Sequence, residues 1–434
     1  MYRKAYKELS KWRLNQNRKP LVFLGARQVG KTWLLHEFGK TAYNQVVYVN
    51  FEDRDAPKNI FQEDFNIDRI VTLLNAYSGL SISAENTLIV FDEIQAAPRG
   101  VTSLKFFYEK APQYQIIAAG SLLGINIHPG ESFPVGKVDF LTLYPLDFTE
   151  FLLAMGETGL VGLIEKRDWE AVQSFHSKLA NYLKYYLYVG GMPEAVLRFS
   201  QNRDWREVRD IQNSILKAYE SDFSKHAPKE ILPRIKMVWD AIPVQLAKEN
   251  KKFIYGVIRQ GARAKDFELA IQWLVDSGLL HKVFGVSKPS LPLTAYRELS
   301  SFKLYINDTG LLGAMSKLNA KTIIHGDVVF TEFKGALAEQ FVFQQLMLNE
   351  RLSIHYYSFE NSKYEIDFIV QNADDEIIPV EVKSGGNLKA RSFQLYCDKY
   401  KPNKAVRTSP SNYRKESWMT NVPLYIIGEY LDVL

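Results

Sequence analysis

The feature that most constrains the fold is a glycine-rich run between two predicted secondary-structure elements. Residues 25–32 read Gly-Ala-Arg-Gln-Val-Gly-Lys-Thr and fit the pattern G-x-x-x-x-G-K-[ST] at every fixed position. The apolar run Leu21–Leu24 precedes them, and a helical pattern follows. In such a strand–loop–helix unit, backbone N–H groups converge on phosphate oxygens at the helix N-terminus. We therefore expect a nucleotide-binding loop formed by Gly25, Ala26, Arg27, Gln28, Val29, Gly30, Lys31 and Thr32.

The residues around this loop predict an α/β domain with a parallel sheet. Short, almost continuous apolar runs recur at 21–24, 46–49, 87–91 and 115–119, with helical patterns between them. Strands that are apolar on both faces are typical of parallel sheets covered by helices. We expect an α/β P-loop domain over residues 1–150.

Two adjacent carboxylates complete the expected nucleotide site. Asp92 and Glu93 directly follow the apolar run 88–91, as the acids of a Walker B strand do. We expect Lys31 to contact the β- and γ-phosphates of ATP, and Thr32 and Asp92 to hold Mg²⁺. Glu93 is then the residue that orients and polarises the attacking water. These residues predict an ATP-hydrolysing enzyme with ATP and Mg²⁺ as cofactors.

A further candidate lies at the end of another predicted strand. Residues 115–119 are followed by Gly120 and Ser121. A strand inserted between the two Walker strands offers a polar side chain to the γ-phosphate or the water, and Ser121 is the candidate. Arg27 and Gln28 face the same region, but the sequence assigns no catalytic role to Arg27 and locates no arginine finger.

The middle of the chain has a different pattern. Residues 151–250 are predicted to be mostly helical, with a break at 190–193. A helix at 265–278 then precedes apolar runs at 279–284 and 302–307, separated by a loop with two prolines. Helix, strand, loop and strand in this order favour a winged helix. We expect a helical and winged-helix-like domain over residues 151–330.

The C-terminal residues predict a second α/β domain, over residues 331–434. A helical run at 335–348 contains Glu339, and strands are expected at 353–359, 365–370 and 377–383. The period of two places Glu381 and Lys383 on one face of their strand, and Asp367 joins them if its strand lies alongside and antiparallel. Carboxylates at Asp367 and Glu381 suit Mg²⁺ or Mn²⁺, with Lys383 near a scissile phosphate.

This C-terminal pattern resembles the core of the PD-(D/E)xK nuclease superfamily. Asp367, Glu381 and Lys383 stand for the D, (D/E) and K of the motif, and Glu339 is the upstream acid. The proline before the aspartate is absent, because Glu365 and Ile366 precede Asp367. An active nuclease and an inactive binding domain both remain open.

Charge and composition narrow the class of protein. Residues 201–330 contain 20 Lys and Arg against 14 Asp and Glu, a net charge of +6, within a chain of net charge +5. A basic segment of this kind favours contact with nucleic acid, although a solvated surface is the alternative. The chain has one cysteine, Cys397, and lacks a long uninterrupted apolar run. We therefore expect a cytoplasmic protein without a membrane contact.

Several motifs together resemble one family along almost the whole chain. They are Gly25–Leu34, Asn50–Glu52, Asp92–Gln95, Leu143–Leu146, Gly190–Glu194, Asp308–Leu311 and Pro379–Lys383. This combination is similar to bacterial AAA-type P-loop ATPases that carry a C-terminal DUF4143 region. The resemblance implies an ATPase core, a winged-helix-like middle and a nuclease-like tail, with the Walker roles at Gly30, Lys31, Thr32, Asp92 and Glu93. It implies no particular substrate.

Three functions follow as hypotheses. In the first, ATP turnover changes how the basic middle segment holds DNA. In the second, the chain is a regulatory ATP switch with a protein partner and an inactive nuclease-like tail. In the third, a metal-dependent nuclease at the tail is coupled to the ATPase. The sequence leaves the oligomeric state open.

Overall fold

The computed structural model describes residues 1–120, 133–248, 252–325, 331–359, 364–385 and 391–432. The chain divides into two compact units. The N-terminal unit contains Tyr2–Tyr144 with Asp276–Gly278, and the C-terminal unit contains Pro145–Val275 and Leu279–Leu434, with Met1 assigned to it. This division differs from the three domains expected from the sequence, because strands from both sides of residue 330 share one sheet.

The N-terminal unit is built on the predicted parallel sheet. Over the described residues, five strands pair in the order β2-β3-β4-β1-β5, and every pairing is parallel. Strands β3 and β4 are buried along their whole length, as their apolar runs predict. This confirms the α/β P-loop fold. The elements are α1 (Ala5–Leu14), β1 (Leu21–Leu24), α2 (Lys31–Ala42), β2 (Gln45–Asn50), α3 (Ile67–Ser78), β3 (Thr87–Asp92), α4 (Gly100–Lys110), β4 (Gln115–Ala119) and β5 (Asp139–Thr142).

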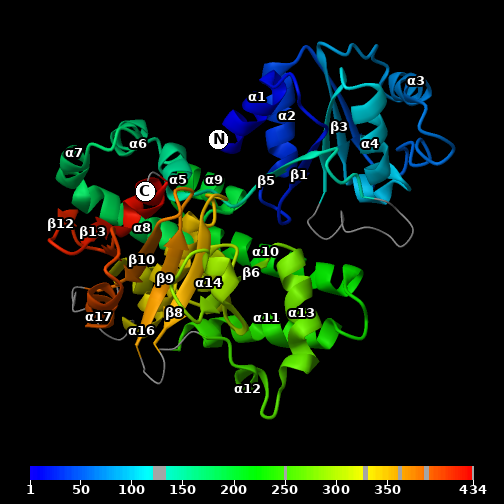
Figure 1. The fold of residues 1–434 in the computed structure, drawn as a ribbon. Coiled ribbons are helices and arrows are strands. Elements are labelled where there is room, and N and C mark those ends of the chain that lie inside the picture. The colour runs from blue at the N-terminus through cyan, green and yellow to red at the C-terminus, as the bar shows by residue number, and fades with distance from the viewer. Residues whose placement is uncertain (121–132, 249–251, 326–330, 360–363, 386–390, 433–434) are drawn as a thin grey trace. The chain divides into compact units, whose positions relative to one another are not determined.

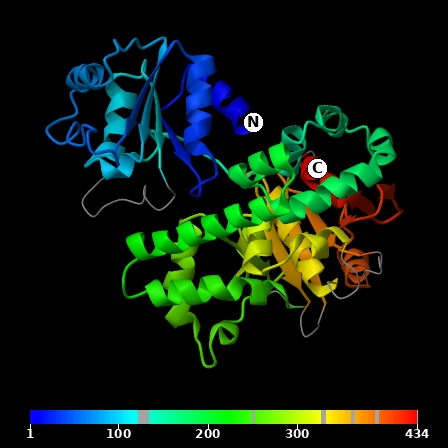
Figure 2. The same ribbon diagram turned by 180° about the vertical axis from the view of Figure 1, so that it is seen from behind.

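Helices cover both faces of this sheet. Helices α1 and α2 lie on one face, and α3 and α4 lie on the other (Figures 1 and 2). Between the sheet and α4, the fully buried rings of Phe51, Phe61 and Phe91 pack with centroids 5.6 to 5.8 Å apart. Aromatic pairs at this spacing add to the free energy gained from burial. They hold the end of β3, where the two predicted acids lie, against a rigid core.

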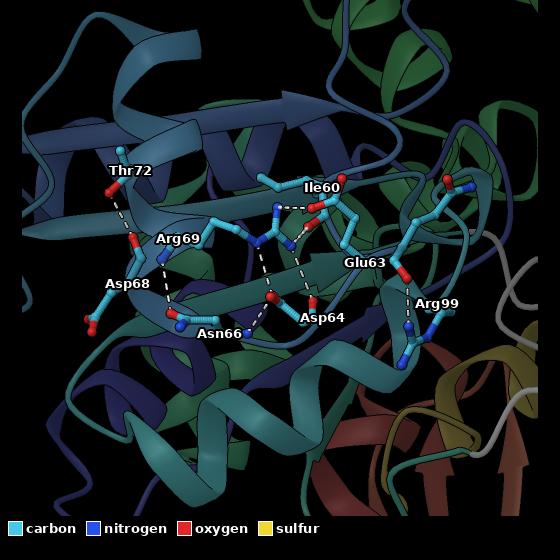
Figure 3. A network of polar contacts seen from close by, with 9 residues as sticks. Ile60, Glu63, Asp64, Asn66, Asp68, Arg69, Thr72 and Arg99 are labelled. Carbon is cyan, nitrogen blue, oxygen red and sulfur yellow. Dashed lines mark hydrogen bonds and ion pairs between the residues drawn. The ribbon is translucent and has the colours of Figure 1, made fainter.

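Polar contacts with α3 and with the start of α4 hold the connection between β2 and α3 in place (Figure 3). The Arg69 guanidinium donates to Asp64 Oδ1 at 2.9 Å, and Asn66 caps α3 by accepting from the Arg69 N–H at 3.1 Å. Arg99 donates to the Gln62 carbonyl at 2.7 Å from the start of α4. These contacts order a long loop that contains little regular structure of its own.

The first half of the C-terminal unit is helical, as expected for residues 151–250. The helices are α5 (Phe148–Ala154), α6 (Thr158–Glu165), α7 (Trp169–Ser174), α8 (His176–Val189), α9 (Pro193–Asn202), α10 (Trp205–His226), α11 (Leu232–Leu246), α12 (Tyr255–Ile258) and α13 (Ala264–Asp276). The predicted break lies between α8 and α9, where Pro193 starts the new helix.

A buried aspartate explains two of the family motifs. Asp308, fully buried, accepts from the Gly191 N–H at 2.5 Å and from the Leu311 N–H at 2.9 Å, and so joins the α8–α9 break to the start of α14 (Thr309–Met315). Gly190 has φ of +73°, and a side chain there would meet the Asp308 carboxylate. Burial raises the pKa of Asp308 to about 6, although the backbone N–H groups oppose the rise. These two motifs therefore stabilise the fold.

The second half of the unit contains a mixed sheet. Among the described residues it has eight strands in the order β12-β13-β11-β10-β9-β8-β6-β7. Its strands and flanking helices are β6 (Leu280–Val286), β7 (Arg297–Ile306), α15 (Ala320–His325), α16 (Thr331–Leu346), β8 (Ser353–Ser358), β9 (Glu365–Gln371), β10 (Ile377–Val382), α17 (Arg391–Tyr400), β11 (Val406–Ser409), β12 (Arg414–Lys415), β13 (Thr420–Pro423) and α18 (Ile427–Leu431).

The predicted wing is part of this sheet. Strands β6 and β7 form the expected antiparallel hairpin, but β6 also pairs in parallel with β8 through Gly285 and Val286. The helix, strand, loop and strand expected for a winged-helix-like segment are present, but the hairpin is joined to a larger sheet through β8, and the side chains of β7 from Ser301 to Ile306 are buried. Within the described part of the chain, no helix is both long and apolar enough to cross a membrane.

Candidate functional site

The glycine-rich loop has the backbone that its sequence predicts. Strand β1 ends at Leu24, helix α2 begins at Lys31, and the residues between them form the loop. Gly25 has φ of +155°, and a Cβ atom on it would lie 2.5 Å from the Leu143 carbonyl oxygen. Only glycine fits so close to another backbone segment at this φ. Gly30 also has a positive φ, of +91°, immediately before the helix.

A buried arginine that the sequence did not single out supports the loop. Arg3 is 4% exposed and donates to the Val29 carbonyl at 2.9 Å and to the Tyr144 carbonyl at 2.6 Å. It thus ties the start of the chain to the loop and to the segment after β5. No local pattern marks Arg3, because its partners are 26 and 141 residues away.

The Lys31 ammonium lies inside the curve of the loop. It donates to the Gly25 carbonyl at 2.8 Å and to the Ala26 carbonyl at 2.9 Å. Burial lowers the pKa of Lys31 to about 8, while Glu93 and Asp92 oppose this and Arg27 adds to it. The loop thus keeps a poorly solvated cation where a phosphate group can replace carbonyl partners.

The hydroxyl and the carboxylate predicted to hold magnesium lie together. Thr32, at the start of α2, donates from Oγ1 to Asp92 Oδ2 at 3.3 Å, from the helix to the end of β3. Tyr48 on β2 also donates its hydroxyl to Asp92 Oδ2, and its ring stacks on His36 with centroids 4.4 Å apart. Tyr48 was missed because its position on an alternating strand carries no motif. Oxygen ligands of this kind suit Mg²⁺.

Glu93 takes a left-handed backbone, with φ of +49°, directly after β3. The Gln95 amide donates to its carboxylate. Burial raises the pKa of Glu93, Asp92 and Glu52 add to the rise, and Gln95 and Lys31 oppose it. A raised pKa makes a carboxylate a better proton acceptor near neutral pH. Glu93 therefore directly follows the Thr32–Asp92 pair in the fold, while its own carboxylate is held by Gln95.

Some of the remaining predicted residues lie within the described part of the chain, and one does not. Strand β4 pairs with β1 on one side and β3 on the other, as expected for an inserted strand. Ser121, the candidate at its tip, lies outside the described residues. Gln28 has a positive φ of +67° within the loop, and the Val29 side chain is buried.

Comparison with protein families identifies the chain. Residues 17–152 match a family model described as an AAA domain, and residues 334–427 match a domain of unknown function, DUF4143. The chain thus contains an AAA-type P-loop domain and, further along, a DUF4143 region. Residues 180–322 match a further domain of unknown function, DUF8612. No functionally curated protein matches the sequence significantly.

Three of the solved structures that match the chain share little sequence with it. The Walker-type ATPase PABY2304 of Pyrococcus abyssi is 15% identical, with a TM-score of 0.44 over 73% of this chain and 95% of its own. The Aeropyrum pernix ORC1 protein, solved in complex with DNA, is 14% identical, with a TM-score of 0.27 over 72% and 90%. Cdc6p from Pyrobaculum aerophilum is 11% identical, with a TM-score of 0.26 over 74% and 93%. Identities this low transfer no activity.

The DUF4143 region brings its predicted acids close together. Strands β9 and β10 are antiparallel, and Asp367 Oδ2 accepts from the Val382 N–H at 2.8 Å. Lys383 contacts Glu381 Oε1 at 2.7 Å, and Glu381 is 3% exposed. Burial raises the pKa of Glu381, and Lys383 opposes this rise. The expected neighbourhood of Asp367, Glu381 and Lys383 is therefore present.

Glu339, on α16, has partners that the sequence did not predict. Its Oε1 atom accepts from the Lys303 ammonium at 3.1 Å and from the Tyr305 hydroxyl, both on β7. Lys303 also contacts Glu365 Oε1 at 2.6 Å. In the described ranges, no group of three or more His, Cys, Asp or Glu side chains is arranged to hold a metal ion. Lys303, from the basic segment of residues 201–330, thus contacts two acids of the DUF4143 region.

Proposed function

We propose that the N-terminal unit hydrolyses ATP with Mg²⁺. The single observation that supports this most strongly is the joint position of Lys31 and Thr32 at the start of α2 and of Asp92 at the end of β3, beside a glycine-dependent loop. Lys31 exchanges loop carbonyls for β- and γ-phosphate oxygens. Thr32 and Asp92 hold the ion, whose charge offsets that of the phosphates. Glu93 orients the attacking water and accepts its proton.

ATP binding should weaken as pH rises through about 8. The Lys31 pKa is lowered to about 8 in the free site, so its ammonium is present below that pH and lost above it. Bound phosphate favours the charged form, so ATP binding takes up a proton in this range, and affinity falls by up to about tenfold per pH unit. Calorimetry in buffers of different ionisation enthalpy measures the uptake. A constant affinity across this range, with no proton uptake, would contradict the role of Lys31.

Tyr48→Phe should lower the Mg²⁺ concentration that gives half-maximal hydrolysis. The Tyr48 hydroxyl donates to Asp92 Oδ2 and competes with the ion for that oxygen. Removing a hydrogen bond to a charged group, which contributes about 1.5–3 kcal/mol, shifts such a competition by about 10- to 100-fold. Phenylalanine keeps the stacking on His36, so the fold is preserved. A Mg²⁺ dependence identical to that of the wild type would show that Tyr48 and the ion do not compete.

DNA is the partner that we propose for the helical part of the C-terminal unit. Residues 225–265 contain ten Lys and Arg against three Asp and Glu, which gives this stretch a net charge of +7. Helices α10 and α13 pack through Phe223 and Trp273, with ring centroids 5.5 Å apart, so this part of the unit has its own aromatic core. Where the structure describes this stretch, its exposed basic residues are Lys225, Lys229, Arg234, Lys236, Lys252, Arg259, Arg263 and Lys265. A concentrated positive charge favours phosphate contacts.

DNA binding through these residues should depend steeply on salt. Affinity for a duplex should fall by at least about tenfold between about 50 and 200 mM salt, since phosphate contacts release counterions. Lys229→Glu with Arg263→Glu should weaken binding, whereas Lys166→Glu, an exposed lysine after α6, should not. Anisotropy of a labelled duplex measures both, and the ATPase rate with and without DNA measures coupling. A partner that is retained after nuclease treatment, with no DNA binding, would favour a protein-regulated switch instead.

A further inference from the structure

Lys303 is the most deeply buried charged side chain beside the acids of the DUF4143 region. These acids, called the tail acids below, are Glu339, Glu365, Asp367 and Glu381. Lys303 lies on β7 with no exposed surface, and its ammonium contacts Glu339 Oε1 at 3.1 Å and Glu365 Oε1 at 2.6 Å. The ammonium also lies 4.9 Å from the centre of the Tyr356 ring. A lysine buried this completely stays charged only where opposite charges surround it.

The surrounding acids supply that compensation. Burial alone lowers the pKa of Lys303, but Glu339, Glu365 and Asp367 more than reverse this and raise it above its usual value. Lys303 in turn favours the charged form of Glu381. One ammonium is therefore electrostatically coupled to acids on α16, β9 and β10.

The tail acids are also engaged with other protein groups. Asp367 Oδ2 holds the Val382 N–H, Glu381 Oε1 holds Lys383, and Glu339 Oε1 holds Tyr305 in addition to Lys303. Glu381 Oε2 is buried without a hydrogen-bond partner among the described residues. A metal ion bound to this cluster would need this oxygen as a ligand, so replacing Glu381 tests for such an ion.

We propose that Lys303 is the resident cation of this carboxylate cluster and takes the place of the divalent metal that a nuclease centre at Asp367 and Glu381 would require. The DUF4143 region then does not cleave nucleic acid. Because β7 lies outside residues 334–427, the cluster of this region is completed by a strand from the preceding segment. Lys303 fixes that strand to α16 and β9.

Metal binding tests the proposal directly. The full chain carrying Asp92→Asn, which silences the nucleotide site, is titrated with Mn²⁺ in the absence of nucleotide, and free Mn²⁺ is read by electron paramagnetic resonance. We expect no stoichiometric binding. One tightly bound Mn²⁺ that is lost on Glu381→Gln would overturn the proposal, as would Mn²⁺-dependent plasmid cutting by the wild type that is lost on Asp367→Ala.

Thermal unfolding tests the role of Lys303 without metal. Lys303→Met keeps the length of the side chain but leaves the acids uncompensated, so we expect the midpoint of the C-terminal unit to fall by about 10 °C. Adding Glu339→Gln to this variant removes one of those charges and should restore at least half of the loss. If Lys303→Met is insoluble, recovery of a folded chain by the double variant supports the same conclusion. A Lys303→Met midpoint equal to that of the wild type, or a double variant no better than the single one, would overturn it.

Discussion

Replacing Glu93 with glutamine should leave ATP binding near the wild-type level and lower the rate of hydrolysis by at least about 100-fold. A carboxylate that accepts a proton from the attacking water contributes about 10²- to 10⁴-fold to the rate. Glutamine has nearly the same shape and can still accept the Gln95 hydrogen bond through its amide oxygen, but it cannot take up the proton. Binding is measured by calorimetry and turnover by phosphate release.

The matched control for Glu93→Gln is Lys31→Ala. This change removes the ammonium that contacts the loop carbonyls and should weaken ATP binding itself, by about 10- to 100-fold, because hydrogen bonds to charged groups contribute about 1.5–3 kcal/mol. The two variants thus separate turnover from binding. Persistent hydrolysis in the Glu93→Gln protein would refute the assignment of Glu93 as the base.

Replacing Asp308 with alanine should produce the largest loss of stability among the substitutions at family motifs. The change leaves the Gly191 and Leu311 N–H groups buried without their acceptor and removes the cap of α14. Each of these two buried donors costs about 1–3 kcal/mol when left unsatisfied, and the Leu311 N–H is itself the capping contact of α14, so we expect the free energy of unfolding to fall by about 2–6 kcal/mol.

Asp240→Ala is the control for this loss. Asp240 is an exposed aspartate on α11 in the same unit, and its removal should change the free energy of unfolding by less than about 0.5 kcal/mol. Urea unfolding monitored by tryptophan fluorescence compares the two variants, since Trp239 lies in the core of this unit. Equal urea midpoints for Asp308→Ala and the wild type would mean that the motif is not structural.

The N-terminal unit was predictable because its signals are local. The loop at residues 25–32, the apolar runs of β1, β3 and β4 and the acids after β3 are each encoded within a few residues of sequence. The parallel pairing of these strands follows from runs that are apolar on both faces. Tyr48 and Arg3 were not predictable, because each acts on the site through partners that are distant in sequence.

The C-terminal unit was predictable in its elements and in the pairing of β9 with β10, but not in the rest of its sheet. The hairpin of β6 and β7 was expected, but its neighbour β8 follows some 70 residues later, and no local pattern specifies that pairing. The sheet that this pairing completes also determines the surroundings of Lys303 on β7. In the sequence it counts toward the basic charge of residues 201–330, whereas in the structure it is fully buried against Glu339 and Glu365. Net charge alone does not distinguish a surface lysine from an internal one.

The most direct test of the central claim is the release of phosphate from ATP by the purified 434-residue chain near neutral pH, with Mg²⁺ or with excess EDTA. We predict many turnovers per molecule with Mg²⁺, almost none with EDTA, and almost none for Lys31→Ala with Mg²⁺. The position of Lys31, Thr32 and Asp92 is the basis of this expectation. Phosphate release by the wild type that does not exceed that of Lys31→Ala would contradict it.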